Sequence, residues 1–272
     1  MKSALGIFVT ALLISTNGFA QYNLEYKVGT SPLHYKAHTS LQTVQSMMGQ
    51  SATVSFTSDQ LISMTNRKEG SELVYSITID SSENMAVMPS GDTNRTPSPA
   101  VGKVKETRVY KNGEEISSQW LDTAFAQTQA GQMKDFGSIF FKLPSGSVDT
   151  GATWSQEKID TVATAGGQGD VVVNTNTNYR FVGSQSYENI KCAKIVFTGQ
   201  VGLKGTATIQ GTDLDIDGKG DISGSALFDI EGGRIVSMSG VSSQDVNMSS
   251  TGANPMTIPM NQKTDYEIQL VK

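Results

Sequence analysis

Apolar and polar residues alternate along most of this chain, with the period of two that is typical of β-strands buried on one face. The alternation is clearest at residues 33–41, 52–56 and 73–79, where mainly apolar residues occupy every second position. It returns after Trp154 and predicts further strands over residues 170–181, 190–198, 204–216, 224–230, 234–246 and 257–271. The sequence therefore predicts a mainly β fold, in which long antiparallel strands form a curved sheet, a half-barrel or a sandwich.

Glycine, asparagine and proline residues mark the predicted ends of these strands. Asn112 and Gly113 lie between two strand-like segments and predict a type I′ hairpin, because both central residues of that turn need a positive φ. The other turn signals are Met48–Gly49, Asn66–Gly70, Pro89–Pro99, Gly166–Gly169, Gly183 and Gly232–Gly233.

Two segments also fit helical spacing. Leu41, Val44 and Met48 would share one face of a short helix, which is the alternative to a strand there. A short helical insert is predicted near residues 118–131, where Ser118 can cap the start and Gly131 can end the helix. The side chains that recur at helical spacing in this insert are Trp120, Leu121, Ala124, Phe125 and Thr128.

The strand-rich stretches on either side of the insert suggest two pseudo-related halves that meet near residues 132–150. They share too few identical residues to establish a duplication. We therefore expect residues 21–272 to form a single β-rich domain.

The N-terminal residues have the pattern of an export signal. Lys2 precedes an apolar run over residues 4–13, and Gly18 and Ala20 place small residues before a cut after Ala20. We therefore expect residues 1–20 to be a cleaved, Sec-type signal peptide and the mature protein to be periplasmic or extracellular. After the signal, no apolar run approaches the about 20 residues that a transmembrane helix needs, so none is expected in the mature chain.

Composition limits the classes of partner. The formal net charge is −5 and there is no basic stripe with interleaved aromatic residues, so nucleic acid is not an expected partner. A hydrophobic share of 37% with 17% charged residues is typical of a folded chain. The single cysteine, Cys192, excludes an intramolecular disulfide and a thiolate zinc cluster, and we expect it to be buried. No cofactor is expected.

The sharpest local match to a known site is a calcium-loop pattern. Its carboxylates would be Asp213, Asp215, Asp217 and Asp221. Gly218 stands where such a loop turns tightly, but the last position, which should be a bidentate Glu, is Gly224.

A structural role is the alternative for these aspartates, and the sequence favours it. Asp213, Asp215 and Asp217 would form the hydrated face of a strand whose buried face is Leu214 and Ile216, with Asp217–Gly218 as the turn of a hairpin. On this interpretation there is no metal site.

Two other patterns are weaker. His34 and His38 could share one face and begin a metal site, although zinc usually takes a third or fourth protein ligand. Ser155 and Lys158 have the Ser-x-x-Lys spacing of penicillin-binding enzymes, but the companion Ser-Asp-Asn and Lys-Thr-Gly elements are missing. We therefore predict no catalytic residues and no enzymatic activity, with a hydrolase of unrecognised site as a minor alternative.

Three stretches of the chain carry a resemblance to a known family. Leu143–Trp154 contains Leu-Pro and ends in Gly-Ala-Thr-Trp, Tyr179–Ile195 follows, and Gly224–Ser237 contains Phe-Asp before Gly-Arg-Ile-Val-Ser. These stretches resemble a family of exported bacterial envelope proteins known only as a domain of unknown function. The resemblance covers most of the mature chain and implies an envelope location and a β-rich fold, but no activity.

In outline, long exported strands with one helical insert are also similar to the outer-membrane lipoprotein carrier proteins, whose curved half-barrel holds acyl chains. The first functional hypothesis is therefore a non-enzymatic periplasmic or secreted protein that binds an apolar or amphipathic envelope component, a lipid or a lipoprotein. The insert could act as a lid. The side chains expected to adapt to acyl chains are Met133, Phe136, Phe140 and Phe141. The alternative is a structural or interaction module of the envelope that contacts protein or glycan.

Overall fold

The computed structural model describes residues 21–47, 49–128, 139–163, 169–209, 212–250 and 255–271. In these residues it contains one short helix, α1 (Thr123–Ala126), and strands that account for most of the chain. The strands are β1 (Tyr22–Asn23), β2 (Leu33–Met47), β3 (Gln50–Glu69), β4 (Glu72–Val87), β5 (Thr93–Thr96), β6 (Val104–Tyr110), β7 (Glu115–Trp120), β8 (Ser147–Val148), β9 (Thr153–Ala163), β10 (Asp170–Tyr187), β11 (Ile190–Ile209), β12 (Thr212–Asp229), β13 (Arg234–Ser250) and β14 (Met256–Val271). The predicted mainly β class is confirmed.

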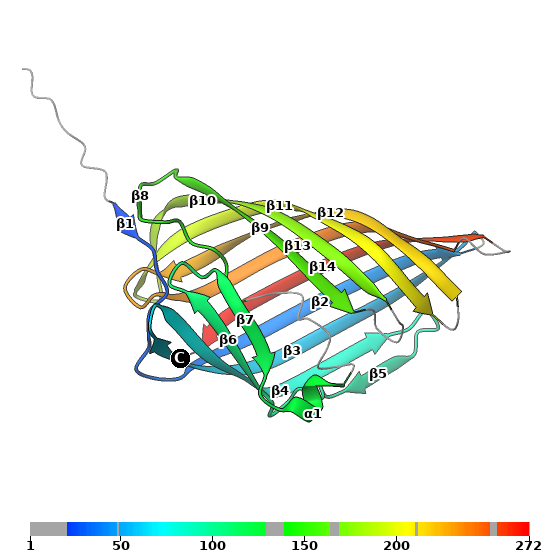
Figure 1. Cartoon of the computed structure of the whole chain (residues 1–272), viewed down its shortest axis with the longest axis horizontal. Helices are drawn as coiled ribbons and strands as arrows, with labels where there is room; N and C mark the ends of the chain where they lie inside the picture. Colours follow the sequence, from blue (N-terminus) through cyan, green and yellow to red (C-terminus); the bar gives the residue numbers. More distant parts are fainter. Residues whose placement is uncertain are drawn as a thin grey trace, which may run out of the picture.

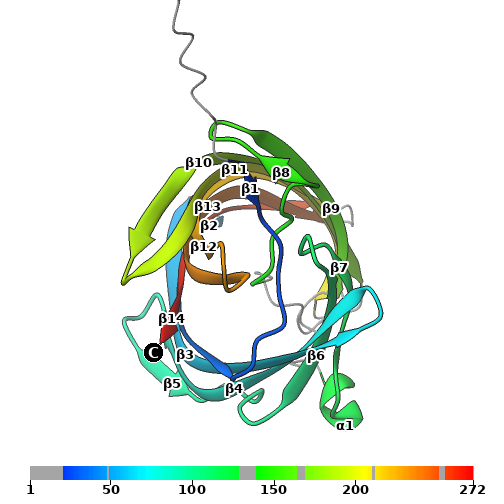
Figure 2. The ribbon, with the colours of Figure 1, turned by 90° about the vertical axis from the view of Figure 1, so that its left-hand side faces the viewer.

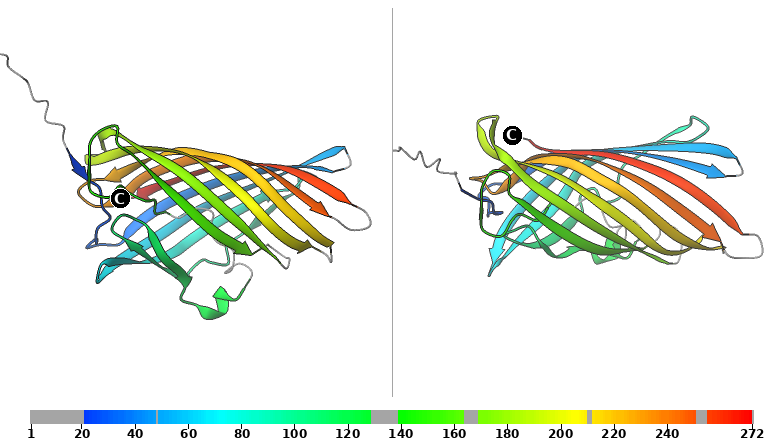
Figure 3. Two further views of the ribbon diagram at one scale, coloured as in Figure 1. Left: turned by 45° about the horizontal axis from the view of Figure 1, so that its top comes forward. Right: turned by 90° about the horizontal axis from the view of Figure 1, so that it is seen from above.

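The long strands form one curled antiparallel sheet (Figure 1). Its order is β7-β6-β4-β3-β2-β14-β13-β12-β11-β10-β9, and β5 pairs with β4 beside this path. The pairing of β14 with β2 joins the strands before α1 to those after it. The two ends of the path, β7 and β9, approach each other as the sheet curls, which gives an open half-barrel whose strands run obliquely along its length (Figure 3).

Two short segments lie inside one end of this curl. They are residues 22–27 and 139–148, which we call the plug, and they are joined by the pairing of β1 with β8. Figure 2 views the sheet from this end, with the N-terminal segment crossing the ring of strands. We call this the closed end, because the plug supplies a second layer that the sheet's apolar face can bury itself against.

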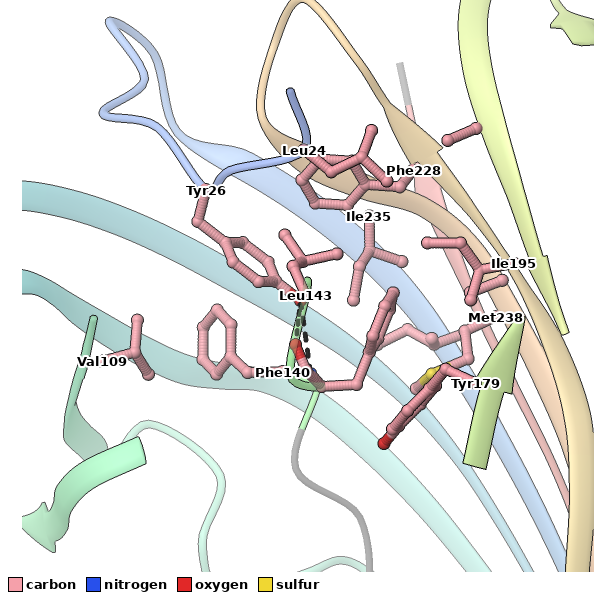
Figure 4. Packing of buried hydrophobic residues seen from close by; sticks show 14 of the residues in the cluster. Leu24, Tyr26, Val109, Phe140, Leu143, Tyr179, Ile195, Phe228, Ile235 and Met238 are labelled. Atoms are coloured by element: carbon pink, nitrogen blue, oxygen red, sulfur yellow. Dashed lines mark hydrogen bonds between the residues drawn. The ribbon is translucent and has the colours of Figure 1, made fainter. Parts of the chain in front are cut away.

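The closed end holds the main hydrophobic core (Figure 4). Tyr26 of the plug lies edge-on to Phe228 of β12 and to Phe140, with ring centroids 5.2 and 5.5 Å apart. Leu24 and Leu143 are also buried there, at 2% and 0% exposure. Each fully buried side chain of this size contributes about 1.5–3 kcal/mol, so the plug is an integral part of the core.

The period-two alternation sorts side chains to the inner and outer faces, as the sequence predicts. On β2 the residue Tyr35 is buried against the plug, whereas its neighbours His34 and Lys36 are exposed. Residues 41–47 belong to the same strand, so the helical alternative for Leu41 and Val44 is wrong, while Met48 lies outside the described residues.

The helical insert begins later than predicted. Residues 115–120 form β7, and the Ser118 hydroxyl, expected to cap a helix, is 2.8 Å from the Thr107 hydroxyl across the β6–β7 pair. The N-cap is Asp122, whose carboxylate accepts from the Phe125 N–H at 2.9 Å. Pairing with β6 satisfies the backbone of this segment, which spacing along the chain cannot reveal. Gly131 lies outside the described residues.

Several predicted turns are placed differently. At the β6–β7 turn only Gly113 has a positive φ, +81°, so the turn is not type I′. The two consecutive positive values belong to Glu188 (47°) and Asn189 (67°), which link β10 to β11. Gly183 lies at a bulge inside β10 rather than in a turn.

The predicted hairpin turn at Asp217–Gly218 is also wrong. Both residues lie inside β12, and the predicted strand over residues 204–216 is in fact the end of β11 and the start of β12. The Gly232–Gly233 turn between β12 and β13 is confirmed.

Candidate binding surface inside the curled sheet

The inner face of the sheet changes character along the strands. Beyond the closed-end core lies a polar belt of uncharged side chains, and beyond that a second apolar cluster, the distal patch. On β14 the inward residues pass from Ile268 and Tyr266, through Thr264 and Gln262, to Met260. Along this strand the inner face therefore has an apolar, then a polar, then an apolar zone.

Strand register places further uncharged polar side chains at the same level around the curl, with the apolar residues Val201, Ile222, Leu41 and Phe56 between them. The members of the polar belt are Thr39, Thr43, Ser58, Gln60, Ser82, Asn84, Thr175, Thr177, Ser242, Gln244, Gln262 and Thr264. Gln244 faces Gln262, which faces Thr43, and Thr39 faces Ser58, which faces Asn84. The members outside β4 share parity with core residues of their own strands, and an irregularity in the β3–β4 register places Ser82 and Asn84 opposite Gln60 and Ser58, so all of them point to the inside.

Part of the belt is satisfied by its own hydrogen bonds. The Ser58 hydroxyl donates to Asn84 Oδ1 at 2.7 Å, and Ser82 donates to the same oxygen at 3.0 Å. Gln60 Nε2 donates to Ser58 Oγ at 3.2 Å. Ser58 is only 7% exposed, whereas Gln60 is half-buried. The belt thus combines side chains held by mutual hydrogen bonds with amide groups that solvent or a ligand can reach.

The distal patch is smaller and looser than the closed-end core. Its buried members are Val171, Ala207, Ile216 and Val246, with Val173, Leu203, Met248 and Met260 packed against them and partly exposed. The row Val173, Leu203, Gly218, Val246 and Met260 crosses five neighbouring strands. Partly exposed aliphatic and methionine side chains form an adaptable apolar surface.

The seam between the two sheet edges carries charge. Lys158 of β9 reaches Glu115 of β7, with 3.6 Å between Nζ and Oε2, and Asp160 on its own strand, at 3.2 Å. Nearer the closed end the plug bridges the edges: Trp154 Nε1 donates to the Lys142 carbonyl at 2.6 Å, and the Leu143 N–H donates to the Asn112 carbonyl at 2.6 Å.

The inner surface owes its tight curvature to a row of glycines and rings. Phe197, Gly224, Gly240 and Tyr266 face one another across four strands. A Cβ on Gly240 would lie 2.5 Å from Tyr266 Oη, and one on Gly224 would lie 2.5 Å from Phe197 Cζ. Only glycine lets each ring lie flat on the neighbouring strand. Burial raises the pKa of Tyr266 to about 12.

The outer face carries two polar depressions of about 580 and 480 Å³. They meet at His38 and Glu267 and span β12, β13, β14, β2, β3 and β4. His38 Nδ1 lies 2.7 Å from Asp59 Oδ1, and both side chains are largely exposed. The depressions are lined mainly by serine, carboxylate, amide and lysine groups, so a partner there would be polar.

The structure places the candidate calcium ligands along one face of a strand. Asp213, Asp215, Asp217 and Asp221 are exposed on the outer side of β12, and Leu214 and Ile216 are buried on its inner side. An extended strand holds alternate residues about 6.5–7 Å apart, whereas a calcium loop folds its ligands around one point. Within the described ranges, no three His, Cys, Asp or Glu side chains are grouped so that they could hold a metal ion.

The other sequence candidates are also separated. His34 and His38 lie on the outer face of β2, where His34 Nδ1 is 2.9 Å from the Ser63 hydroxyl. The Ser63 hydroxyl also donates to the Asp80 carboxylate, so His34 and Asp80 contact the same exposed hydroxyl group.

Ser155 and Lys158, which have the Ser-x-x-Lys spacing, and Cys192 also lie in strands. Ser155 and Lys158 are three residues apart on β9, so they point to opposite faces. Cys192 is 0% exposed, and burial raises the pKa of its thiol to about 11. Its predicted burial is confirmed.

Sequence reasoning missed the polar belt. The sequence did contain a signal for it. Met238, Ser242, Gln244 and Val246 of β13 all have even numbers, so these polar and apolar residues share one face of the strand. Among the described helices, none is long and apolar enough to cross a membrane.

Comparison with known proteins gives no family. No family model matches the chain, and no curated protein matches it. Solved structures similar to this chain include OccK5 (OpdH) of Pseudomonas aeruginosa, at 7% identity and a TM-score of 0.28, covering 89% of this chain and 99% of that one. The β domain of the Bordetella autotransporter BrkA is 12% identical, with a TM-score of 0.23 and coverage of 86% and 98%. A loop L8 deletion mutant of OmpT, an outer-membrane protein of Vibrio cholerae, is 9% identical, with a TM-score of 0.23 and coverage of 89% and 99%.

Proposed function

We propose that this chain is an exported, non-enzymatic protein of the periplasm or the extracellular space that binds an amphipathic envelope component, a lipid or the acyl part of a lipoprotein, on the inner face of its curled sheet. The observation that carries the proposal is the order of zones on that face. The polar belt would hydrogen-bond a head group, and the distal patch would cover an apolar tail.

The lining chemistry favours a ligand with an uncharged or weakly charged polar group. The belt supplies hydroxyl and amide groups such as Gln60 and Gln262, which both donate and accept. Covering the partly exposed side chains of the distal patch would contribute roughly 25 cal/mol for each Å² of apolar surface removed from water. The outer strand faces are mainly polar, with separate exposed residues such as Val172, so the apolar cluster that could cover a tail lies inside the curl.

Two of the side chains expected to meet acyl chains have another role. Phe140 and Phe141 are 8% and 6% exposed and belong to the closed-end core, so the proposed ligand surface does not include them. Met133 and Phe136 lie outside the described residues. The export pattern at residues 1–20 and the resemblance to exported envelope proteins, including the lipoprotein carriers, support the proposed location.

A matched pair of variants on β10 tests the binding surface. Thr175→Trp places an indole on the inner face within the polar belt, and Asn174→Trp places one on the outer face of the same strand. With a fluorescent fatty-acid probe and purified residues 21–272, we expect Thr175→Trp to weaken binding at least tenfold and Asn174→Trp to leave it unchanged. Thermal unfolding of both variants checks that each is folded.

Organic extraction and mass spectrometry of the wild-type protein complete the test. Co-purified amphiphile that is reduced in Thr175→Trp supports the proposal. Equal probe binding by both folded variants, or a wild-type protein that neither carries nor binds any amphiphile, would overturn it.

A second candidate function is an interaction module that contacts envelope protein or glycan, and the outer depressions favour it. Their meeting point at His38 and Glu267, with Asp59 beside it in the larger depression, offers polar groups on a concave surface. Binding of the protein to isolated envelope fractions should then be lost in Asp59→Lys and kept in Asp215→Lys, which changes another exposed outer carboxylate, on β12.

A further inference from the structure

One buried carboxylate oxygen at the closed end has no hydrogen-bond partner. It is Oδ1 of Asp149, the residue that follows β8, and within the described part of the chain it is the one buried side-chain oxygen or nitrogen without a partner. An unpaired polar atom costs free energy when it is buried, and a charged atom costs more than a neutral one. An orphaned atom in a native fold therefore calls for a group that supplies the missing donor.

The backbone that carries this carboxylate is held in place. The Ala152 N–H donates to the Asp149 carbonyl at 3.1 Å, and the Phe181 N–H donates to the Ala152 carbonyl at 2.9 Å. The Gly151 N–H completes the link by donating to the Phe181 carbonyl at 2.8 Å. These bonds tie residues 149–152 to β10, so the Asp149 carboxylate is presented at a defined position.

The strand beside β8 begins next to the predicted start of the mature chain. β1 and β8 are antiparallel, with Tyr22 opposite Val148 (Figure 1). One step further outward along this register brings Gln21 beside Asp149. The backbone nitrogen of the first predicted mature residue is thereby brought to the vicinity of the unpaired oxygen.

Tyr22 anchors the chain at this point. Its ring lies edge-on to Phe181, with 5.3 Å between centroids, and its hydroxyl is 3.0 Å from the Ser184 hydroxyl. The Lys191 ammonium lies over the same ring, 5.4 Å from its centroid. These three contacts hold residue 22 against β10 and β11, and they limit how far residue 21 can move from Asp149.

Removal of the predicted export signal changes the chemistry of this nitrogen. Hydrolysis adds water across the Ala20–Gln21 bond, which leaves a carboxylate on Ala20 and an amino group on Gln21. In the precursor the nitrogen is a neutral amide with one N–H, whereas the free amino group is mostly protonated at pH 7, since its ordinary pKa is about 8. An ammonium has three N–H donors, and its hydrogen bonds to a carboxylate are charge-assisted.

We propose that the N-terminal ammonium of mature Gln21 binds the Asp149 carboxylate, so that removal of the export signal locks β1 of the plug to β8. The precursor lacks this ion pair, and its β1 depends on the contacts of Tyr22 and on the core behind it. The proposal rests on the predicted cut after Ala20 and does not depend on a ligand inside the curl.

Hydrogen–deuterium exchange of the amides in β1 and β8 tests the ion pair. The reference protein begins at Gln21, and a second protein carries Gly-Ser before Gln21, which moves the ammonium out of register. Asp149→Asn is made in both. In the protein that begins at Gln21, we expect Asp149→Asn to speed exchange at least tenfold, since loss of one member of a buried ion pair leaves the other unpaired. The Gly-Ser extension alone should have the same effect, and Asp149→Asn should not speed exchange further in the extended protein.

Asp215→Asn, which changes an exposed carboxylate on β12, is the matched control and should leave exchange in β1 and β8 unchanged. Thermal unfolding checks that every variant is folded. The intact mass of the exported wild-type protein should match a chain that begins with an uncyclised Gln21, because cyclisation of the glutamine would remove the ammonium.

Three outcomes would overturn the proposal. They are an exported protein that begins at another residue or with a cyclised glutamine, an extension that leaves exchange unchanged, and an Asp149→Asn effect of equal size in both proteins. The probe assay on Thr175→Trp involves neither Gln21 nor Asp149, so failure of this proposal and failure of the ligand-binding proposal are distinguishable.

Discussion

The closed end and the distal half of the inner face are built by the same strands, yet only the closed end is a filled core. At the closed end, aromatic rings of the sheet bury themselves against plug residues such as Tyr26 and Leu143. In the distal half, Val173, Leu203 and Met260 remain partly exposed. Alternation alone therefore produces an apolar face, and a core forms where a second layer covers it.

The closed end therefore contributes mainly to the stability of the fold, whereas the distal half is the region that we propose binds a ligand. A filled core of rings in edge-on contact leaves no room for a ligand and resists opening. A loosely covered surface of aliphatic side chains behind a polar belt can accept one at little cost to the fold. The largest expected difference between the two regions is the access of a reagent to their side chains.

Thiol labelling should distinguish the two regions by orders of magnitude. Cys192 is fully buried near the closed-end core and its pKa is raised to about 11. At pH 8 this pKa alone lowers the thiolate fraction by about 240-fold relative to an ordinary cysteine of pKa about 8.5, and burial slows the reaction further. In Cys192→Ala with Val173→Cys, the distal cysteine should react with a maleimide at least 100-fold faster than Cys192 does in the wild type.

The control is the same reaction in denaturant, where both cysteines should react at similar rates. Rapid native labelling of Cys192, or a protected cysteine at position 173, would contradict the division into a filled and an accessible region.

Truncation of buried side chains should cost more at the closed end. Phe228 is 0% exposed and its ring contacts Tyr26, so Phe228→Ala should lower the free energy of unfolding by about 3–5 kcal/mol. Met260→Ala in the distal patch removes a partly exposed side chain and should cost about 1–2 kcal/mol, since part of it is already in water. Urea unfolding at equilibrium measures both, and equal losses would mean that the distal patch is packed like the core.

Sequence alone predicts the strands and their faces but not which apolar face is covered. Alternation is local, so residues 33–41 reveal a strand and its two sides. The second layer at the closed end includes Leu24 and Phe140. They lie in short segments outside the long strands that they cover, and the sequence around them does not alternate. That information depends on long-range packing.

The wrong predictions of local structure also arise because long-range contacts cannot be read from neighbouring residues. Ser118 is a suitable helix cap and Trp120 fits helical spacing, but pairing with β6 places both residues in a strand. Asp217–Gly218 resembles a turn. Both residues nevertheless pair with β11 on one side and with β13 on the other, so β12 continues through them. The polar belt was hidden because a serine or threonine in an alternating pattern is expected on the solvent side, whichever face it occupies.

Curvature at the boundary of the two regions depends on the glycine row. Gly240→Ala brings a Cβ against the Tyr266 ring, and overpacking of this kind costs about 1–3 kcal/mol. If contact with the Tyr266 ring causes this loss of stability, Gly240→Ala should be nearly neutral when it is made in a Tyr266→Ala background. A double-mutant cycle by urea unfolding should thus give a coupling energy of about 1–2 kcal/mol, and additive losses would place the strain in the backbone.

The smallest effect is expected on the outer surface over the closed end. There Arg67 and Arg108 flank Val74, which is 0% exposed, and both donate to Glu69 at 2.8 Å. Hydrogen bonds from Arg67 and then Arg108 lower the pKa of Glu69 below its ordinary value. A carboxylate whose folded pKa is depressed stabilises the protein above its unfolded pKa, and that contribution is lost as the pH falls through the folded pKa.

Glu69→Gln should therefore be slightly less stable than the wild type at pH 7, and the difference should vanish as the pH falls below about 4, where the unfolded and then the folded carboxyl group protonates. Added salt should also reduce the difference, because the groups are exposed to solvent. Asp215→Asn removes an outer carboxylate in the distal half of β12 and serves as the matched control. If both variants follow the same pH profile, the arginines beside Val74 act through the packing of their aliphatic stems rather than through Glu69, and the closed end owes its stability to burial on both faces of the sheet.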